Sequence, residues 1–277
     1  MSVADKLNYL NETKNLIKQS LIDNGAEISD TTTFREYADK INELSPKSFD
    51  ISGLSLWFDA TCNTRNGFDE SKAYVEPLIV TPNDIESSVT YTTYYKSNTS
   101  GSWSGKLLDL GENGALKINH AYYNNPMTIE AVYRFSEISS TESVQRLWHA
   151  GVYTLCIFGL NSSEHAGRFW ATGGGDELPL AKTDILYYTV FQYDTTNGVT
   201  VRIEPDGIVQ NYPDAVLELP STSSYFGIAT PASTSSSFSS STYSAGMQFG
   251  MVRCWNRILT DEEINRNYKE IKRKFEI

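Results

Sequence analysis

Cysteine and long apolar runs are scarce in this chain of 277 residues. Its three cysteines, Cys62, Cys156 and Cys254, are too few and too scattered for a disulfide framework or a zinc site. Such sparing use is typical of synthesis in a reducing cytosol. No run approaches the roughly 18 apolar residues of a membrane-spanning helix. The charged N-terminus also lacks the basic start and apolar centre of a signal peptide. We therefore expect no membrane insertion and no signal sequence.

Basic side chains are scarce as well, with 23 Lys and Arg against 34 Asp and Glu and a formal net charge of −11. The excess lies in residues 49–252, which carry 10 basic and 21 acidic side chains, spread singly. Because a body of this charge repels phosphate backbones, we expect no nucleic-acid partner. Solubility at high local concentration is a sufficient explanation for the acidic excess.

Residues 1–44 are predicted to form two short helices. Ser2 with Asp5, and Thr33 with Glu36, have the spacing of capping boxes at helix starts. In the first predicted helix, apolar residues recur every three or four positions, as in a coiled-coil seam that is interrupted by Lys14. The second predicted helix has an apolar stripe of its own. The residues predicted to anchor the chain or to mediate its oligomerisation are Val3, Leu7, Leu10, Ile17, Leu21, Phe34, Tyr37 and Ile41.

These two helices need another surface, because helices of this length are marginal in water by themselves. That surface could belong to a second copy of the chain, to the chain's own body or to a different protein. We expect self-association into a dimer or trimer, with packing on the chain's own body as the alternative.

From about residue 50 to 252 the sequence predicts short strands. Thr128–Phe135, Leu186–Tyr193, Val199–Ile203 and Phe249–Trp255 are rich in alternating apolar, β-branched or aromatic residues. A last capping box, Thr260 with Glu263, starts a terminal helix. The predicted fold class is therefore mainly β: a jelly-roll sandwich of two antiparallel sheets, preceded by an α-helical hairpin and closed by a C-terminal helix.

Four segments carry a family resemblance. They are GLSLWFDATCNTRNGF (Gly53–Phe68), WSGKLLDLGENGALKI (Trp103–Ile118), MTIEAVYRF (Met127–Phe135) and MVRCWNRILTDEEINRNYKEIKRKFEI (Met251–Ile277). In this order they resemble the strands and closing helix of concanavalin A-like, laminin-G-type sandwich modules of phage and prophage virion proteins. Residues 6–44 are separately similar to a short helical N-terminal segment of phage structural proteins.

The resemblance implies a bacteriophage virion structural protein, a head- or tail-attached fibre or adhesin on the virion surface. It would be made in the cytoplasm of the bacterial host. Residues 1–48 would be a helical segment for virion anchoring and oligomerisation, and residues 49–277 the sandwich with its C-terminal helix. Residues 1–44 would bind another head or tail protein. Whether that partner belongs to the head or to the tail stays open.

The sequence shows no constellation for hydrolysis. Some concanavalin-like folds are glycosidases, and their retaining mechanism needs two carboxylates about 5–5.5 Å apart on one face. Relatives of this sandwich usually carry them as Glu-x-Asp-x-Glu, whereas the one Glu-x-Asp here is Glu204-Pro205-Asp206, in a predicted turn. We therefore predict no enzyme and no catalytic residue, with a glycan-degrading tail enzyme of the same fold as the alternative.

No metal or cofactor is expected either. The three histidines, His120, His149 and His165, are not spaced as metal ligands. A calcium ion held by oxygen atoms of Asp59, Asn63 and Asn66 is a weaker alternative.

Two Ser- and Thr-rich stretches, residues 87–104 and 221–244, contain embedded aromatic residues. Rigid rings among small polar side chains make adaptable contact surfaces, as in antibody loops, although tyrosine and threonine are also ordinary strand residues. The hypothesis is weak, multivalent binding of bacterial surface glycans. The tyrosines predicted to contact glycan are Tyr91, Tyr94, Tyr95, Tyr225 and Tyr243.

Overall fold

A computed structural model describes the chain in two compact units, Met1–Ser52 and Gly53–Ile277. The described residues are 2–23, 28–29, 31–37, 51–64, 67–69, 71, 75, 77–80, 93–96, 102–109, 115–118, 126–138, 143–150, 153–159, 168–171, 177–216, 226–228 and 246–275. The boundary between the units lies four residues after the predicted one at residue 48.

The first unit contains the helix α1 (Val3–Asp23) and the 3-10 turn η1 (Phe34–Glu36). The Ser2–Asp5 capping box is confirmed, since the Asp5 N–H donates to Ser2 Oγ at 3.1 Å and the Ser2 N–H to Asp5 Oδ2 at 2.7 Å. At the second box the Thr33 N–H donates to Glu36 Oε2 at 2.6 Å. The continuation of this predicted helix, with Ile41, lies outside the described residues.

The second unit is built from two antiparallel sheets. In the described part of the chain the larger sheet has nine strands. Seven of them run in the order β14 (Ile208–Tyr212), β13 (Gly198–Glu204), β12 (Leu186–Asp194), β7 (Met127–Phe135), β16 (Met247–Trp255), β1 (Leu54–Asp59) and β2 (Pro77–Val80). The hairpin of β4 (Ser102–Ser104) and β5 (Leu107–Asp109) is attached to β16 through β5.

The second sheet has seven strands among the residues described. Their order is β11 (Glu177–Leu180), β10 (Arg168–Ala171), β9 (Tyr153–Gly159), β8 (Ser143–Ala150), β15 (Phe226–Ile228), β6 (Ala115–Ile118) and β3 (Thr93–Lys96).

The core lies between the two sheets. Alternate residues of β7, among them Ile129, Ala131 and Tyr133, belong to it, as the period of two in the sequence predicts. Trp148 of β8 is fully buried, with its ring 5.1 Å from that of Phe191 and 6.4 Å from that of Phe226. The predicted fold class is confirmed: the chain is mainly β, with two antiparallel sheets and a helix at each end.

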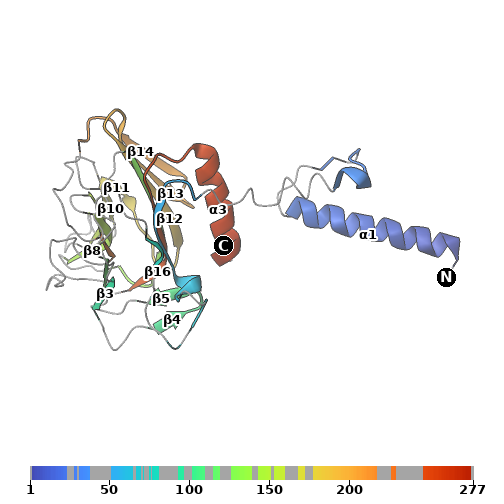
Figure 1. Cartoon of the computed structure of the whole chain (residues 1–277), viewed down its shortest axis with the longest axis horizontal. Helices are drawn as coiled ribbons and strands as arrows, with labels where there is room; N and C mark the ends of the chain where they lie inside the picture. Colours follow the sequence, from blue (N-terminus) through green and yellow to red (C-terminus); the bar gives the residue numbers. More distant parts are fainter. Residues whose placement is uncertain are drawn as a thin grey trace. The chain divides into compact units, whose positions relative to one another are not determined.

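The helix α3 (Asp261–Phe275) covers the outer face of the larger sheet, on the side away from β8 and β10 (Figure 1). Its Ile264 and Ile271 are buried, and its capping box is confirmed by the Glu263 N–H that donates to Thr260 Oγ1 at 3.2 Å. Because a sheet lies against one face of β7 and a helix against the other, nearly every residue of β7 is buried. The polar side chains of Thr128 and Glu130 in β7 are therefore buried as well.

Candidate functional site

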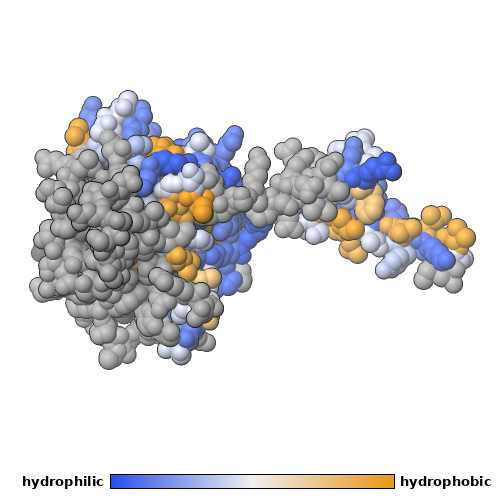
Figure 2. Space-filling view, in the orientation of Figure 1, coloured by the Kyte–Doolittle hydropathy of each residue, from blue (hydrophilic) through white to orange (hydrophobic). Residues whose placement is uncertain are grey.

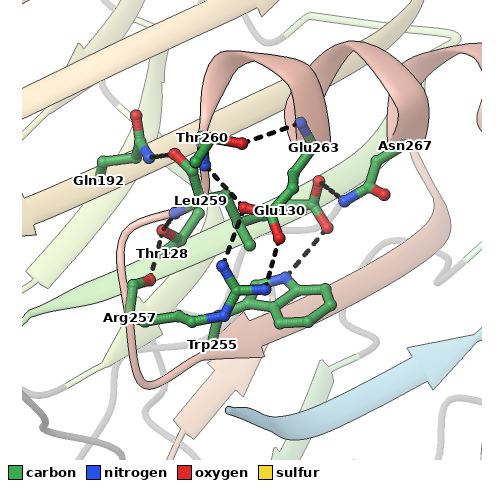
Figure 3. Close-up of polar contacts among 9 residues, drawn as sticks. All are labelled: Thr128, Glu130, Gln192, Trp255, Arg257, Leu259, Thr260, Glu263 and Asn267. Carbon is green, nitrogen blue, oxygen red and sulfur yellow. Dashed lines mark hydrogen bonds and ion pairs between the residues drawn. The ribbon is translucent and has the colours of Figure 1, made fainter. Parts of the chain in front are cut away.

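A buried carboxylate, that of Glu130, lies under α3 on the outer face of β7. Glu130 Oε1 accepts a hydrogen bond from Asn267 Nδ2 at 2.9 Å, and its Oε2 accepts one from Trp255 Nε1 at 3.1 Å (Figure 3). Glu130 Oε1 also accepts a hydrogen bond from the Tyr188 hydroxyl. Arg253 Nε lies 3.3 Å from Glu130 Oε2. These five residues, the Glu130 cluster, connect β7, β12 and β16 with the helix.

The charges of the Glu130 cluster are balanced inside the protein. Arg253 is fully buried, and its Nη1 lies 3.7 Å from Glu270 Oε2 of α3 as well. Burial, and then the neighbouring Glu130 charge, raise the pKa of Tyr188 well above its ordinary range. The hydroxyl therefore stays protonated and donates to the carboxylate. A buried ion is tolerated only with such partners.

The two ends of α3 are held by further contacts. At the start of the helix, Asp261 forms an ion pair with Arg202 of β13 at 2.5 Å. At its end, Lys274 pairs with the fully buried carboxylate of Asp59 in β1. The helix is therefore fixed to the sheet at its beginning, middle and end.

The loop that leads into α3 is closed by an Arg–Glu pair. Arg257 donates from Nη1 to Glu263 Oε2 at 2.8 Å and from Nη2 to Glu263 Oε1 at 2.6 Å (Figure 3). Gln192 Nε2 donates to the Leu259 carbonyl at 2.8 Å, and Thr128 Oγ1 donates to the Arg257 carbonyl at 2.8 Å. The hydrogen bond from Arg257 is the main cause that lowers the pKa of Glu263 from 4.5 to about 2.

This lowered pKa predicts a pH-dependent contribution to stability. The contribution is complete above the unfolded pKa of 4.5 and is lost as the pH falls through about 2. The shift alone corresponds to about 3 kcal/mol, and screening of this partly exposed pair reduces that to about 1–2 kcal/mol. We expect Glu263→Gln to lower the free energy of unfolding by this amount at pH 7 and by much less at pH 2, measured by urea unfolding. Glu262→Gln, on the exposed neighbour, is the control; an equal effect of Glu263→Gln at both pH values would contradict the assignment.

An open cavity of about 290 Å³ lies where the last turn of α3 meets β7, β12 and the β4–β5 hairpin. Its charged groups are Arg134, at the end of β7, and Lys106, in the turn between β4 and β5. Its lining residues are Ser104, Gly105, Lys106, Leu107, Arg134, Leu186 and Phe275. Basic and apolar side chains thus share one opening.

The tyrosines predicted to contact glycan are only partly within the described residues. Tyr94 and Tyr95 lie in the edge strand β3, where they pair with Lys117 and Leu116 of β6. Consecutive strand positions belong to opposite faces of a sheet, so positions 94 and 95 are not part of one surface. Tyr91, Tyr225 and Tyr243 lie outside the described residues.

The predicted anchoring residues differ in their exposure. Val3, Leu7 and Leu10 of α1 are exposed by 76%, 61% and 62%, and apolar side chains are visible on the surface of this helix (Figure 2). Ile17 is half-buried and Phe34 is exposed. Leu21 and Tyr37 are buried. The predicted seam is therefore uncovered in its first half only.

The proposed calcium ligands have other partners. Asp59 Oδ1 accepts hydrogen bonds from the Thr61 N–H and Oγ1, and Asn63 is bonded to the backbone of Asp69. Asn66 lies outside the described residues. Among the residues that the structure describes, no group of three His, Cys, Asp or Glu side chains could hold a metal ion. None of the described helices is long and apolar enough to cross a membrane.

Sequence reasoning missed the Glu130 cluster and Arg134. Two signals were available. Glu130 and Arg134 alternate with the core residues of β7, and Asn267 falls on the apolar stripe of α3 between Ile264 and Ile271. A polar residue at a buried position indicates a buried partner.

Comparison with known proteins gives a likeness in fold. No family model and no curated protein matches the sequence. The structure of Trypanosoma rangeli sialidase in complex with sialic acid is similar with a TM-score of 0.53 and 12% identity, over 95% of this chain and 39% of that one. The same sialidase in complex with the inhibitor DANA has a TM-score of 0.55 and 12% identity, over 94% of this chain and 38% of that one.

The receptor-binding domain of botulinum neurotoxin mosaic serotype C/D has a TM-score of 0.48 and 9% identity, over 79% of this chain and 51% of that one. At that score it adds nothing to the fold assignment. The chain thus spans about two fifths of the length of the sialidases, at 39% and 38%. At these identities the likeness establishes the β-sandwich fold alone.

The likeness corrects the prediction that the chain is not an enzyme. The solved structures reported above that have a similar fold include those of a sialidase, which is an enzyme. The prediction depended on the absence of paired carboxylates, but sialidases are an exception to the two-carboxylate scheme, because their nucleophile is a tyrosine. A missing Glu-x-Asp-x-Glu pattern therefore does not exclude glycan hydrolysis for this chain.

The Glu130 cluster contains the residue types of such chemistry, a tyrosine beside a carboxylate and an arginine. Tyr188, Glu130 and Arg253 are nevertheless exposed by 1%, 0% and 0%. No substrate reaches them while α3 is in place, so their role in this structure is to hold the helix.

Proposed function

We propose that the sandwich unit is a glycan-binding or glycan-acting domain. The observation that carries this proposal is the fold that the chain has in common with sialidases solved with sialic acid and with the inhibitor DANA. The apolar and basic cavity supports it, because ligand sites combine apolar walls with a few polar groups that orient the ligand.

The finer part of the proposal is a concanavalin A-like module displayed on a bacteriophage virion. The four family-like segments and the similarity of residues 6–44 to phage helical segments support it. The exposed residues Val3, Leu7 and Leu10 suit a helix that binds further copies and a head or tail protein. The module would then present its sandwich to bacterial surface glycans, with no nucleic-acid or membrane partner.

A second candidate, hydrolysis of a surface glycan, is favoured by the identity of the structural neighbours, which are sialidases. The two candidates differ in turnover. A binding module leaves the glycan unchanged, whereas an enzyme releases a shorter glycan or a free sugar.

A glycan array probed with the full-length protein tests the proposal. We expect binding to a subset of bacterial surface glycans, and mass spectrometry of the same glycans after incubation shows whether any is cleaved. Tyr94→Ala and Tyr95→Ala are made separately, since the two positions belong to opposite sheet faces. At least one of them is expected to lower array binding about tenfold, the effect of removing an aromatic anchor from a binding surface.

Tyr9→Ala is the matched control, because Tyr9 is an exposed tyrosine of α1, outside the sandwich. Loss of binding in this control would indicate a general effect on the protein. Unchanged binding by both β3 variants would show that Tyr94 and Tyr95 do not contact the glycan. If the protein neither binds nor cleaves any glycan, the proposal is overturned.

A further inference from the structure

We propose that the cavity beside the end of α3 binds the carboxylate of an acidic sugar, with Arg134 as its main partner. This inference rests on the proposed glycan function and adds the class of ligand and the site.

Arg134 is held in place by neutral groups. Its Nε donates to Gln248 Oε1 at 2.6 Å and its Nη2 to Ser104 Oγ at 3.0 Å. A guanidinium has five N–H groups, so three further donors remain after these two bonds. Among the residues that the structure describes, no carboxylate forms an ion pair with Arg134. Its charge is therefore oriented but not neutralised from within the described chain.

Arg202 shows what a compensated arginine on the same sheet face looks like. It lies on β13 and forms an ion pair with Asp261 at 2.5 Å. In a chain of net charge −11, acidic partners are abundant. The neutral partners of Arg134 are thus an unusual choice, and they keep its remaining N–H groups available to an anion from outside.

Lys106 supplies the second positive charge at the cavity. Its Nζ donates to the carbonyl of Lys274 in the last turn of α3, at 2.8 Å. Gly105, with φ of +61°, lies in the turn between β4 and β5. Its neighbours Ser104 and Lys106 both line the cavity. Two cations at one concave site on a negatively charged body attract an anion.

The other walls select a sugar over a small inorganic anion. Leu107, Leu186 and Phe275 present carbon atoms to the cavity. The C–H face of a pyranose ring can lie against such walls, and its carboxylate can accept two parallel hydrogen bonds from a guanidinium. Phosphate or chloride gains nothing from the apolar walls. The chemistry therefore favours a uronic or nonulosonic acid residue of a glycan.

The test uses the full-length protein and four probes in ligand-observed NMR titrations. The probes are the methyl glycosides of glucuronic acid, N-acetylneuraminic acid and glucose, and inorganic phosphate. We expect at least one acidic glycoside to bind about tenfold or more tightly than the neutral glucoside. Arg134→Gln should weaken that binding about 10- to 100-fold, the range of a hydrogen-bonded charge pair. Lys106→Gln, on an exposed turn, should weaken it several-fold without risk to folding.

Arg202→Gln is the control, since this arginine is already paired with Asp261. Unchanged binding of the acidic glycoside in both Arg134→Gln and Lys106→Gln overturns the cavity assignment, and so does equal binding of acidic and neutral glycosides. The glycan proposal itself survives either result if the array shows binding. If phosphate competes as strongly as the acidic glycoside, the site is a general anion site and the sugar assignment is overturned. If the glycan array is negative but the acidic glycoside binds to the full-length protein and Arg134→Gln weakens this binding, the cavity assignment is supported. The proposed glycan function then fails.

Discussion

Replacing Glu130 by alanine is expected to lower the free energy of unfolding by about 3–5 kcal/mol, because the change takes the nearer carboxylate away from a buried charge. Arg253 is fully buried and loses its Glu130 neighbour, while Glu270 Oε2 stays 3.7 Å from its Nη1. The donors of Tyr188, Trp255 and Asn267 lose their acceptor at the same time. A loss of this size is a large fraction of a typical domain's stability. Urea unfolding followed by tryptophan fluorescence measures it.

Two comparisons separate this effect from a general one. Glu262→Ala, on the exposed face of α3, is expected to change stability by no more than about 0.5 kcal/mol. The double replacement Glu130→Leu with Arg253→Met removes both charges and is expected to be less destabilising than Glu130→Ala, because no buried charge is left alone. A loss below about 1 kcal/mol for Glu130→Ala would contradict the structural role of the cluster.

We expect the full-length protein to form a dimer or trimer, and aspartate at both Leu7 and Leu10 to convert it to a monomer. Both side chains are exposed on α1, at the seam positions that a second copy would cover. Light scattering at tens of micromolar protein measures the mass. If glycan binding depends on many weak sites, the same change should reduce binding to a multivalent surface by a factor of about 10²–10⁴.

Leu16→Asp is the matched control for this experiment. Leu16 is exposed by 72% but lies off the seam that the two heptad rows of Leu7 and Leu10 form. It should therefore leave the mass unchanged. A monomeric wild-type protein would contradict self-association and leave a different protein as the partner of α1. Equal dissociation by the Leu16 variant would show that the seam is not the interface.

Much of the fold follows from local patterns in the sequence. The period of two in Met127–Phe135 and Leu186–Asp194 predicts strands, and the structure has them as β7 and β12. The capping boxes at Ser2 and Thr260 form because both partners are three residues apart in the chain. Such features depend on neighbours in sequence, so alternation and spacing are enough to find them.

The candidate site depends on contacts that no local pattern contains. The partners of Glu130 are 58, 125 and 137 residues away from it in the chain. The Arg134–Ser104 contact spans 30 residues, and Phe275 reaches the same cavity from the end of α3. Alternation places Glu130 and Arg134 on the outer face of β7 but does not say what covers that face.

The sequence by itself therefore determined the strands, the helix starts and the mainly β class, because these depend on residues that are close in the chain. The tertiary structure decided that α3 covers the outer face of the larger sheet at Glu130, which made Glu130 a buried carboxylate with hydrogen-bond and ion-pair partners. It also left Arg134, four residues further along the same strand, at an open cavity with neutral partners. Of two polar residues on one strand face, Glu130 is thus buried and Arg134 lines an open cavity, because burial depends on where a distant helix ends.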